Sequence, residues 1–329
     1  MHKSVFFTIL IGALWSCQNT KPPSPKSMSL DEALKMHPDS IALLQQRANR
    51  SLDSMNYSLL LQDAARAFRL DSTNLESRLL YALGLINKKN VGASDFTTAQ
   101  YHFVKVLSKD STNLKALVGI AGVCANLGGN EAAFGWLNKA LRINPRYRDA
   151  YVLKGSIYLR EGNYKFAKSS YETAVQQDRT FFLGYLMLGT IYQYEKNPLC
   201  IEYFTTACQL QPKNTEACYS LAYAYENFDK VKEAKRFYRR MAKLDSTLCE
   251  PYFHLASIKH FTEGDLDSAM HWYSVALDIN PNHIESLHNL GLLYEDKKDR
   301  TNALLTYAKV LKINPEYPLT KVRVKALQK

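Results

Sequence analysis

Motifs that would mark an enzyme or a metal site are missing from this sequence. It has no Gly-x-Ser-x-Gly motif, no glycine-rich phosphate-binding loop and no pair of candidate catalytic carboxylates. It has no Cys-x-x-Cys and no two histidines four residues apart on one helix face. Five histidines nevertheless cluster near the C-terminus: His254, His260, His271, His283 and His288. We expect them to be hydrogen-bonding or surface side chains, and we expect no enzymatic activity, no cofactor and no metal site.

Glycine and proline are also scarce, with 14 and 11 copies among 329 residues, whereas apolar residues make up 46% of the chain. This composition is typical of an ordered protein that can bury a sizeable core. The net charge of +11 would suit a nucleic-acid partner. The N-terminus argues against that class of partner, because it predicts export.

The N-terminus begins with a short basic stretch and an apolar run, residues 4–16, that is too short to span a bilayer as a permanent helix. The run ends with Leu-Trp-Ser before Cys17. This arrangement resembles a bacterial lipoprotein signal peptide, with the lipobox at these four residues. The resemblance implies a signal peptide at 1–16, with the lipidated Cys17 and a flexible linker at 17–28. A simple secretory signal with a chance cysteine is the alternative.

The same resemblance implies a location. Gln18 is not the aspartate that retains lipoproteins in the inner membrane, so the outer membrane is favoured, with the protein in the bacterial cell envelope and facing the periplasm. No other stretch is long and apolar enough to span a membrane. We therefore expect a membrane contact through the lipid on Cys17 and no nucleic-acid partner.

A regular rhythm runs through the rest of the chain. The phrase Ile-Asn-Pro ends at Pro145, Pro281 and Pro315, and the first two of these prolines are four times as far apart as the last two. A series of small residues recurs at nearly the shorter interval: Ala99, Ala133, Ala167, Cys200, Ala234, Ala269 and Ala303. Four residues after each comes a large one: Phe103, Leu137, Tyr171, Phe204, Tyr238, Tyr273 and Tyr307. A spacing of four places both residues on one helix face.

The pattern is similar to the tetratricopeptide repeat, whose period is about 34 residues. Residues 148–181 match it best, through the following positions: Tyr151, Gly155, Tyr158, Ala167, Tyr171 and Ala174. The resemblance implies an all-α fold, a right-handed superhelical solenoid of about eight helix-turn-helix repeats. The expected repeats are 41–74, 75–113, 114–147, 148–181, 182–214, 215–248, 249–283 and 284–317, which together form an array over 41–317. A half-repeat at 29–40 and a capping helix at 318–329 would close its two ends.

The five cysteines beyond Cys17 leave alternatives open. Cys200 and Cys218 lie at small or core positions of the repeat, Cys124 lies where tyrosine is usual, and five is an odd number, all of which favours buried free thiols. A single disulfide is conceivable in an exported protein, joining Cys200 or Cys208 to Cys218 across adjacent helices. A metal-binding or catalytic role is the remaining alternative.

The basic run at 230–243 falls on a second helix, which this family places on its convex face. It is either a solvated helix wall or a surface attracted to anionic lipid head groups.

The concave face, lined by the first helices, is where this family binds partners. Ten side chains are the expected partner-binding residues: Tyr81, Leu85, Val118, Val152, Leu186, Tyr219, Tyr223, Phe253, His288 and Leu292. Charges at its edge are acidic: Glu216, Glu226, Glu250, Glu285 and Glu295. The Lys and Asn pair that clamps a terminal carboxylate in chaperone-binding members is absent. An apolar surface with an acidic rim suits a peptide or helix that carries basic residues.

These observations predict a lipid-anchored periplasmic scaffold or assembly factor that binds a protein or peptide in its concave groove. The alternative is a periplasmic receptor for a small ligand or glycan, such as a peptidoglycan fragment, with Tyr219, Tyr223 and Phe253 stacking on sugar rings.

Overall fold

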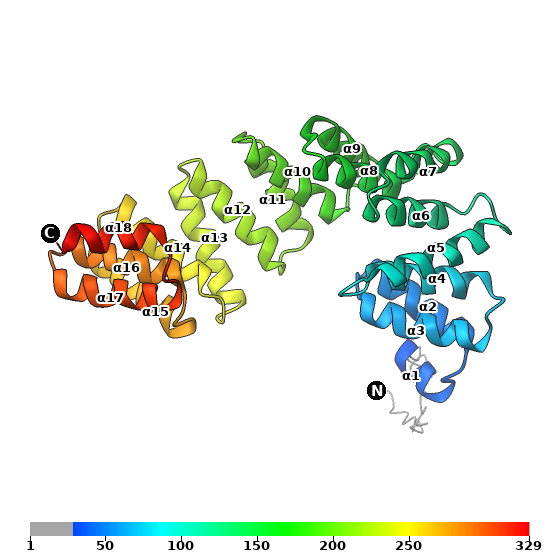
Figure 1. The fold of residues 1–329 in the computed structure, drawn as a ribbon, viewed down its shortest axis with the longest axis horizontal. Helices are drawn as coiled ribbons and strands as arrows, with labels where there is room; N and C mark the ends of the chain where they lie inside the picture. Colours follow the sequence, from blue (N-terminus) through cyan, green and yellow to red (C-terminus); the bar gives the residue numbers. More distant parts are fainter. Residues whose placement is uncertain (1–28, 329) are drawn as a thin grey trace, which may run out of the picture. The chain divides into compact units, whose positions relative to one another are not determined.

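The computed structural model describes residues 29–328, and throughout this range the chain is helical and contains no strand (Figure 1). The predicted all-α class is therefore confirmed. The predicted signal peptide, the lipidation site Cys17 and the linker lie outside the described residues. None of the described helices is long and apolar enough to cross a membrane.

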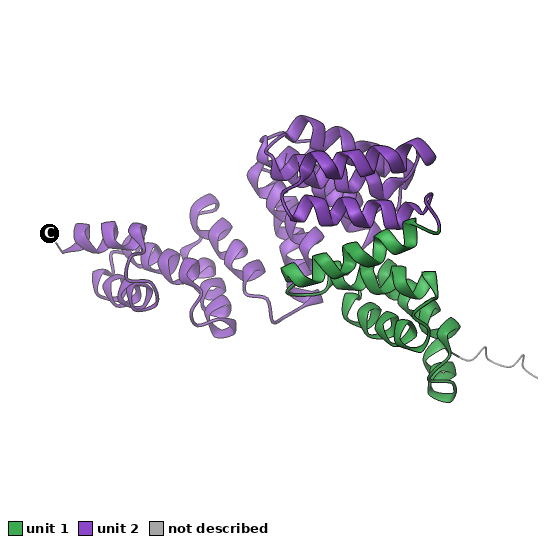
Figure 2. Cartoon of the chain, turned by 45° about the vertical axis from the view of Figure 1, so that its right-hand side comes forward, with its two compact units in different colours: residues 1–109 green, residues 110–329 purple. Residues whose placement is uncertain are grey.

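The chain divides into two compact units, one ending at Lys109 and one beginning at Asp110 (Figure 2). The N-terminal unit contains α1 (Leu30–Met36), α2 (Ile41–Asp53), α3 (Tyr57–Leu70), α4 (Leu75–Asn87) and α5 (Ala93–Leu107). The C-terminal unit begins with α6 (Leu114–Asn126), α7 (Asn130–Ile143), α8 (Arg148–Arg160), α9 (Tyr164–Gln177), α10 (Phe182–Tyr194) and α11 (Cys200–Leu210). It continues with α12 (Thr215–Asn227), α13 (Val231–Leu244), α14 (Glu250–Ser257), α15 (Leu266–Ile279), α16 (Ile284–Asp296), α17 (Arg300–Ile313) and α18 (Pro318–Leu327).

Consecutive helices pack as hairpins, from α2 with α3 to α16 with α17, and each hairpin also contacts the next one within its unit. A small residue on the first helix receives a large one from the second. A Cβ atom on Gly155 would lie 3.0 Å from the ring of Tyr171, and one on Gly189 would lie 2.5 Å from the ring of Phe204. Glycine at these positions lets the two helix axes approach closely.

Apart from α5, which ends at Leu107 before Ser108, the second helix of each repeat stops in one of two ways. Before Pro145 the helix ends at Ile143, and Asn144 is extended because a residue preceding proline avoids the helical region. Where proline is absent, an aspartate ends the helix instead. Asp178 is extended, and its carboxylate accepts hydrogen bonds from the backbone N–H and the hydroxyl of Thr180, at 2.9 and 2.7 Å. Both arrangements keep the chain out of the helix before the next repeat begins.

Most first helices end in a residue with a left-handed backbone conformation. Glycine fills this place at Gly128, Gly162 and Gly264, whereas Met55, Lys196, Asp229 and Lys298 adopt it with a side chain. At Gly162 the following N–H, that of Asn163, bonds to the carbonyl of Tyr158 at 2.8 Å, which closes the helix end.

The seventh repeat holds one additional residue, and the structure shows where it goes. The interval from Ala256 to Ala269 is one residue longer than the equivalent interval from Gly155 to Ala167. The end of its first helix is a π-helical turn, η1 (Ile258–Thr262), closed by a bond from the N–H of Glu263 to the carbonyl of Ile258. The wider turn absorbs the extra residue inside the helix.

The core explains the abundance of tyrosine. Four of its largest fully buried side chains are equivalent tyrosines of the second helices, namely Tyr171, Tyr238, Tyr273 and Tyr307. Each buried hydroxyl needs a hydrogen-bond partner, and each finds one on the first helix of its own repeat. The partners are Ser156, Glu226, Ser257 and Glu295, at 3.0, 2.6, 3.4 and 2.5 Å.

Candidate binding surface on the first helices

The expected partner-binding residues of the N-terminal unit are largely occupied by packing. Tyr81 is half-buried and stacks on Phe68, with ring centroids 5.3 Å apart, and it meets the edge of His102. Leu85 is buried. Neither side chain offers a large free surface to a partner.

In the C-terminal unit the expected residues differ strongly in access. Leu186 is buried against the next repeat, and the buried His288 bonds through Nδ1 to the hydroxyl of Thr320 on α18 at 2.8 Å. These two depart from the expectation that they face a partner, because neighbouring helices cover them, and so does Leu85, which is buried. Val118, Val152 and Leu292 are half-buried.

The remaining three expected residues, Tyr219, Tyr223 and Phe253, gather at one place. We call this place the Tyr219 cluster, which consists of Tyr219, Tyr223 and Glu226 on α12, Tyr238 on α13, and Phe253 and His254 on α14. The rings of Tyr219 and Tyr223 are parallel, with centroids 6.0 Å apart. The ring of Tyr238 stacks on the ring of His254, with the two centroids 4.6 Å apart and an angle of 5° between the ring planes.

A chain of hydrogen bonds fixes these side chains. The carboxylate oxygen Oε2 of Glu226 accepts from the hydroxyl of Tyr238 at 2.6 Å and lies 2.9 Å from Nδ1 of His254. A nitrogen facing a carboxylate carries a proton, so in neutral His254 the other nitrogen, Nε2, is an acceptor. That nitrogen lies 3.0 Å from the hydroxyl of Tyr219, which donates to it. Tyr219 is thereby held in one orientation.

Burial keeps the donors of this chain protonated. It raises the pKa of Tyr219 to about 12, and Tyr223, Glu226 and Glu250 act in the same direction. It also raises the pKa of Tyr238, with the Glu226 carboxylate adding to the effect. Both phenols therefore remain hydrogen-bond donors at neutral pH, and the cluster keeps one arrangement.

The outer side of the cluster is accessible and acidic. Tyr223 is 37% exposed, whereas Tyr219 and Phe253 are half-buried. Glu216 and Glu250, both expected at the rim, are exposed, as is Glu285 in the eighth repeat. The surface thus offers aromatic rings next to carboxylates, which is a combination that attracts cations.

Two of the expected rim acids are used inside the molecule instead. Glu226 belongs to the hydrogen-bond chain described above, and Glu295 accepts from Tyr307 and from the guanidinium of Arg323 on α18. Burial alone would raise the pKa of Glu295, but the hydrogen bonds from Arg323 and Tyr307 outweigh this effect and lower that pKa.

Sequence reasoning missed His254 and Tyr238 as parts of this site, because both occupy core positions of the repeat. One pattern in the sequence could have identified them: a glutamate near the end of the first helix combined with a tyrosine on the second helix of the same repeat. This pattern occurs twice, as Glu226 with Tyr238 and as Glu295 with Tyr307.

A hollow in the N-terminal unit was also not foreseen. Its volume is about 730 Å³, and it is formed where the longer turn of the second repeat follows α4. Lys88 and Lys89 of this turn line it together with Tyr57, Leu61 and Arg69 of α3. Lys88 is already paired with Asp95 at 2.8 Å, which reduces the free charge of the hollow.

The basic run at 230–243 coincides with α13, which buries Ala234, Tyr238 and Met241 on its inner side. Its outer side carries exposed cations, among them Lys232, Arg239 and Arg240. Among the described residues, no group of three or more His, Cys, Asp or Glu side chains is placed to hold a metal ion.

A family model described as tetratricopeptide repeat matches residues 149–181, 215–247 and 284–317. The ycf37 protein of Pyropia yezoensis is 31% identical over 136 residues, which cover 38% of this chain and 76% of that protein. Subunit 3 of the anaphase-promoting complex of Schizosaccharomyces pombe is 24% identical over 169 residues. The matched region covers 51% of this chain but only 25% of that subunit. Among solved structures, the Cut9–Hcn1 hetero-tetramer of the APC/C shares the fold, with a TM-score of 0.56 and 16% identity over 92% of this chain and 60% of that one.

Proposed function

The chain belongs to the tetratricopeptide repeat family, and on this premise we propose that it is an interaction scaffold that binds a peptide or helix of a partner protein at the Tyr219 cluster. The observation that carries the proposal is the hydrogen-bond chain from Tyr219 through His254 to Glu226 and Tyr238. It fixes a partly exposed aromatic surface in advance of binding. A surface ordered in advance loses little side-chain entropy when a partner binds.

The chemistry of the cluster selects the partner. Parallel tyrosine rings on a surface with the exposed acids Glu216 and Glu250 suit a segment that presents an arginine or lysine next to an apolar side chain. Aromatic anchors of this kind dominate the energy of many interfaces, and truncating a central one costs about 2 kcal/mol, or roughly a thirtyfold loss of affinity.

A co-purification experiment tests the proposal. A photo-crosslinking amino acid at the exposed Glu250 should trap a partner protein in the native cell, and the double variant Tyr219→Ala with Tyr223→Ala, carrying the same probe, should lose that partner. Tyr194→Ala is a matched control, because Tyr194 is an exposed tyrosine of the same unit that lies outside the cluster. A partner retained by the double variant but lost by the control would refute the assignment of the site.

The proposal places the scaffold in the bacterial envelope, anchored through lipid on Cys17, with the outer membrane favoured and the repeats facing the periplasm. Its support is the N-terminal sequence alone, and two or more acyl chains would make the anchor durable. A Cys17→Ser variant should move from the membrane fraction to the soluble fraction of the envelope. If this variant still fractionates with membranes, the anchor is not at this cysteine.

A second candidate function rests on the parallel tyrosine pair, since exposed aromatic faces also stack on sugar rings. In this case the chain is a receptor for a glycan such as a peptidoglycan fragment. Muropeptides should then raise its melting temperature, Tyr223→Ala should remove this effect, and crosslinking should trap no protein. We propose no catalytic activity for either function.

A further inference from the structure

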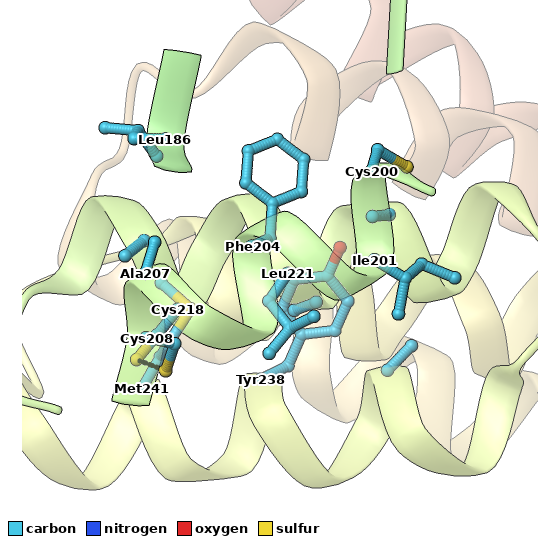
Figure 3. Close-up of a cluster of buried hydrophobic side chains, with 14 of the residues drawn as sticks. Leu186, Cys200, Ile201, Phe204, Ala207, Cys208, Cys218, Leu221, Tyr238 and Met241 are labelled. Atoms are coloured by element: carbon cyan, nitrogen blue, oxygen red, sulfur yellow. Dashed lines mark hydrogen bonds between the residues drawn. The ribbon is translucent and has the colours of Figure 1, made fainter. Parts of the chain in front are cut away.

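Two cysteines face each other where the fifth and sixth repeats meet. Cys208 lies on α11 and Cys218 on α12, and their sulfur atoms are 2.7 Å apart (Figure 3). The exposed fractions of the two side chains are 4% and 0%, so both belong to the core.

We propose that Cys208 and Cys218 are a reversible redox pair, which closes to a disulfide that joins α11 to α12. The two cysteines are ten positions apart, and the connecting segment is the short turn between the two helices. Both side chains lie in one core cluster with Phe204, Leu221 and Met241, which hold the helices in place (Figure 3). The packing of the repeats therefore brings the thiols together before any bond forms.

The surroundings of the pair distinguish the two thiols. The Cys218 thiol donates a hydrogen bond to Cys208, which lowers the pKa of Cys208 to about 7, with help from the positive charge of Arg240. The same interaction, together with burial, raises the pKa of Cys218. Arg240 is held in place by its own hydrogen bond to the carbonyl of Pro212, at 2.9 Å. Cys208 is thus the thiolate of the pair and the nucleophile.

The oxidant is a second disulfide, either of a small molecule or of an oxidoreductase. The Cys208 thiolate attacks one of its sulfurs, which forms a mixed disulfide and releases the other sulfur as a thiolate. Cys218 then gives up its proton and attacks the sulfur of Cys208, and the second thiolate of the oxidant leaves. Two cysteine thiols are oxidised and one disulfide is reduced to two thiols, so the exchange balances.

Closing this bond would tie the start of α12 to the end of α11. Tyr219 directly follows Cys218, so the first residue of the Tyr219 cluster sits beside the crosslink. The inference itself does not depend on what the cluster binds.

Peptide mapping of the full chain tests the inference. The purified protein is incubated with oxidised glutathione, its remaining thiols are alkylated in denaturant, and it is digested with trypsin. Cleavage after Lys196, Lys213 and Lys230 separates the two cysteines into peptides 197–213 and 214–230. We expect these two peptides to be joined, and reduction should release them.

Peptide 197–213 also contains Cys200, so a Cys200→Ser variant serves as the matched control. In this variant the linked pair of peptides should still form, whereas Cys208→Ser should abolish it. Cys218→Ser should stop the reaction at the mixed disulfide of Cys208 with glutathione. Arg240→Gln should slow the oxidation of Cys208 at neutral pH, since it removes the neighbouring positive charge.

The crosslink should also raise the melting temperature of the oxidised wild-type chain by about 5 °C over the reduced chain, because it restricts the unfolded state. Free, alkylated Cys208 and Cys218 in the wild-type chain after prolonged oxidation would overturn the inference. So would peptides linked through Cys200 instead of Cys208. Both readouts use the wild-type chain and do not require any variant to fold.

Discussion

Two glycine-to-alanine substitutions should change stability in opposite directions, although the chemical change is the same. Gly189 is buried on α10, and an added Cβ would lie 2.5 to 2.6 Å from ring atoms of the buried Phe204. Gly135 lies on α7, and an added Cβ there would have no neighbour within 4 Å.

The magnitudes follow from two opposing effects. Alanine in a helix is favoured over glycine by about 1 kcal/mol at either position. Overpacking of a core side chain costs roughly 1–3 kcal/mol, and Phe204 is fully enclosed by its neighbours. We therefore expect Gly135→Ala to stabilise the chain by about 1 kcal/mol, and Gly189→Ala to destabilise it by about 1 kcal/mol after both effects are combined.

Urea unfolding followed by far-UV circular dichroism measures both changes. The third repeat supplies a compensating pair, because there Ala121 faces Leu137 and both are fully buried. Adding Phe204→Leu to Gly189→Ala should therefore cost less than the sum of the two single changes. If Gly189→Ala proves as stabilising as Gly135→Ala, the close helix contact described for these repeats is incorrect.

Three further predictions concern the turns, the histidines and a buried ion pair. Lys298 has a left-handed backbone, with φ of 59°, so Lys298→Gly should raise the free energy of unfolding by about 0.5–1 kcal/mol, as measured by urea unfolding. Burial and the charge of Arg323 lower the pKa of His288 in the folded chain. This histidine therefore takes up a proton more readily in the unfolded chain, and the free energy of unfolding should decrease as the pH falls below about 6.5. Between pH 7 and pH 5, the melting temperature of a His288→Gln variant should fall less than that of the wild type. Substitution of the exposed His271 by glutamine should leave the wild-type pH dependence unchanged. The same pH dependence for His288→Gln and the wild type would contradict this prediction. The Asp63 carboxylate is 2% exposed and accepts two hydrogen bonds from Arg47. Arg47→Met should therefore lower the free energy of unfolding by about 3 kcal/mol, because it leaves a buried carboxylate without its partner. A decrease below about 1 kcal/mol would show that the pair contributes little.

The repeat architecture could be predicted from the sequence because each repeat depends on local spacings. Gly155 and Tyr171 could be paired in advance from the helical period, and the proline of Ile-Asn-Pro could be assigned as a helix stop. The same spacings also identified Tyr219, Tyr223 and Phe253 as neighbours on the first helices.

Access and hydrogen bonding could not be predicted in the same way. Leu186 and Tyr219 occupy the same position of the repeat, yet one is buried and the other partly exposed, since exposure depends on the side chains of the adjacent repeat. The bond between Tyr219 and His254 joins residues 35 positions apart, which no single helix period relates. The left-handed turn at Lys196 also had no glycine to mark it.

The π-helical turn at Ile258–Thr262 has a consequence for how such a chain can change length in evolution. One residue added to a regular helix would rotate every side chain that follows it in that helix by about 100° and would displace the start of the next helix, α15, which carries Tyr273. Because the bulge confines the added residue to one turn, Tyr273 remains buried against Ala256 and its own repeat. Single-codon insertions at this point are therefore nearly silent for packing, and an alignment of repeats should place its gap within these five residues and not in the loop that follows.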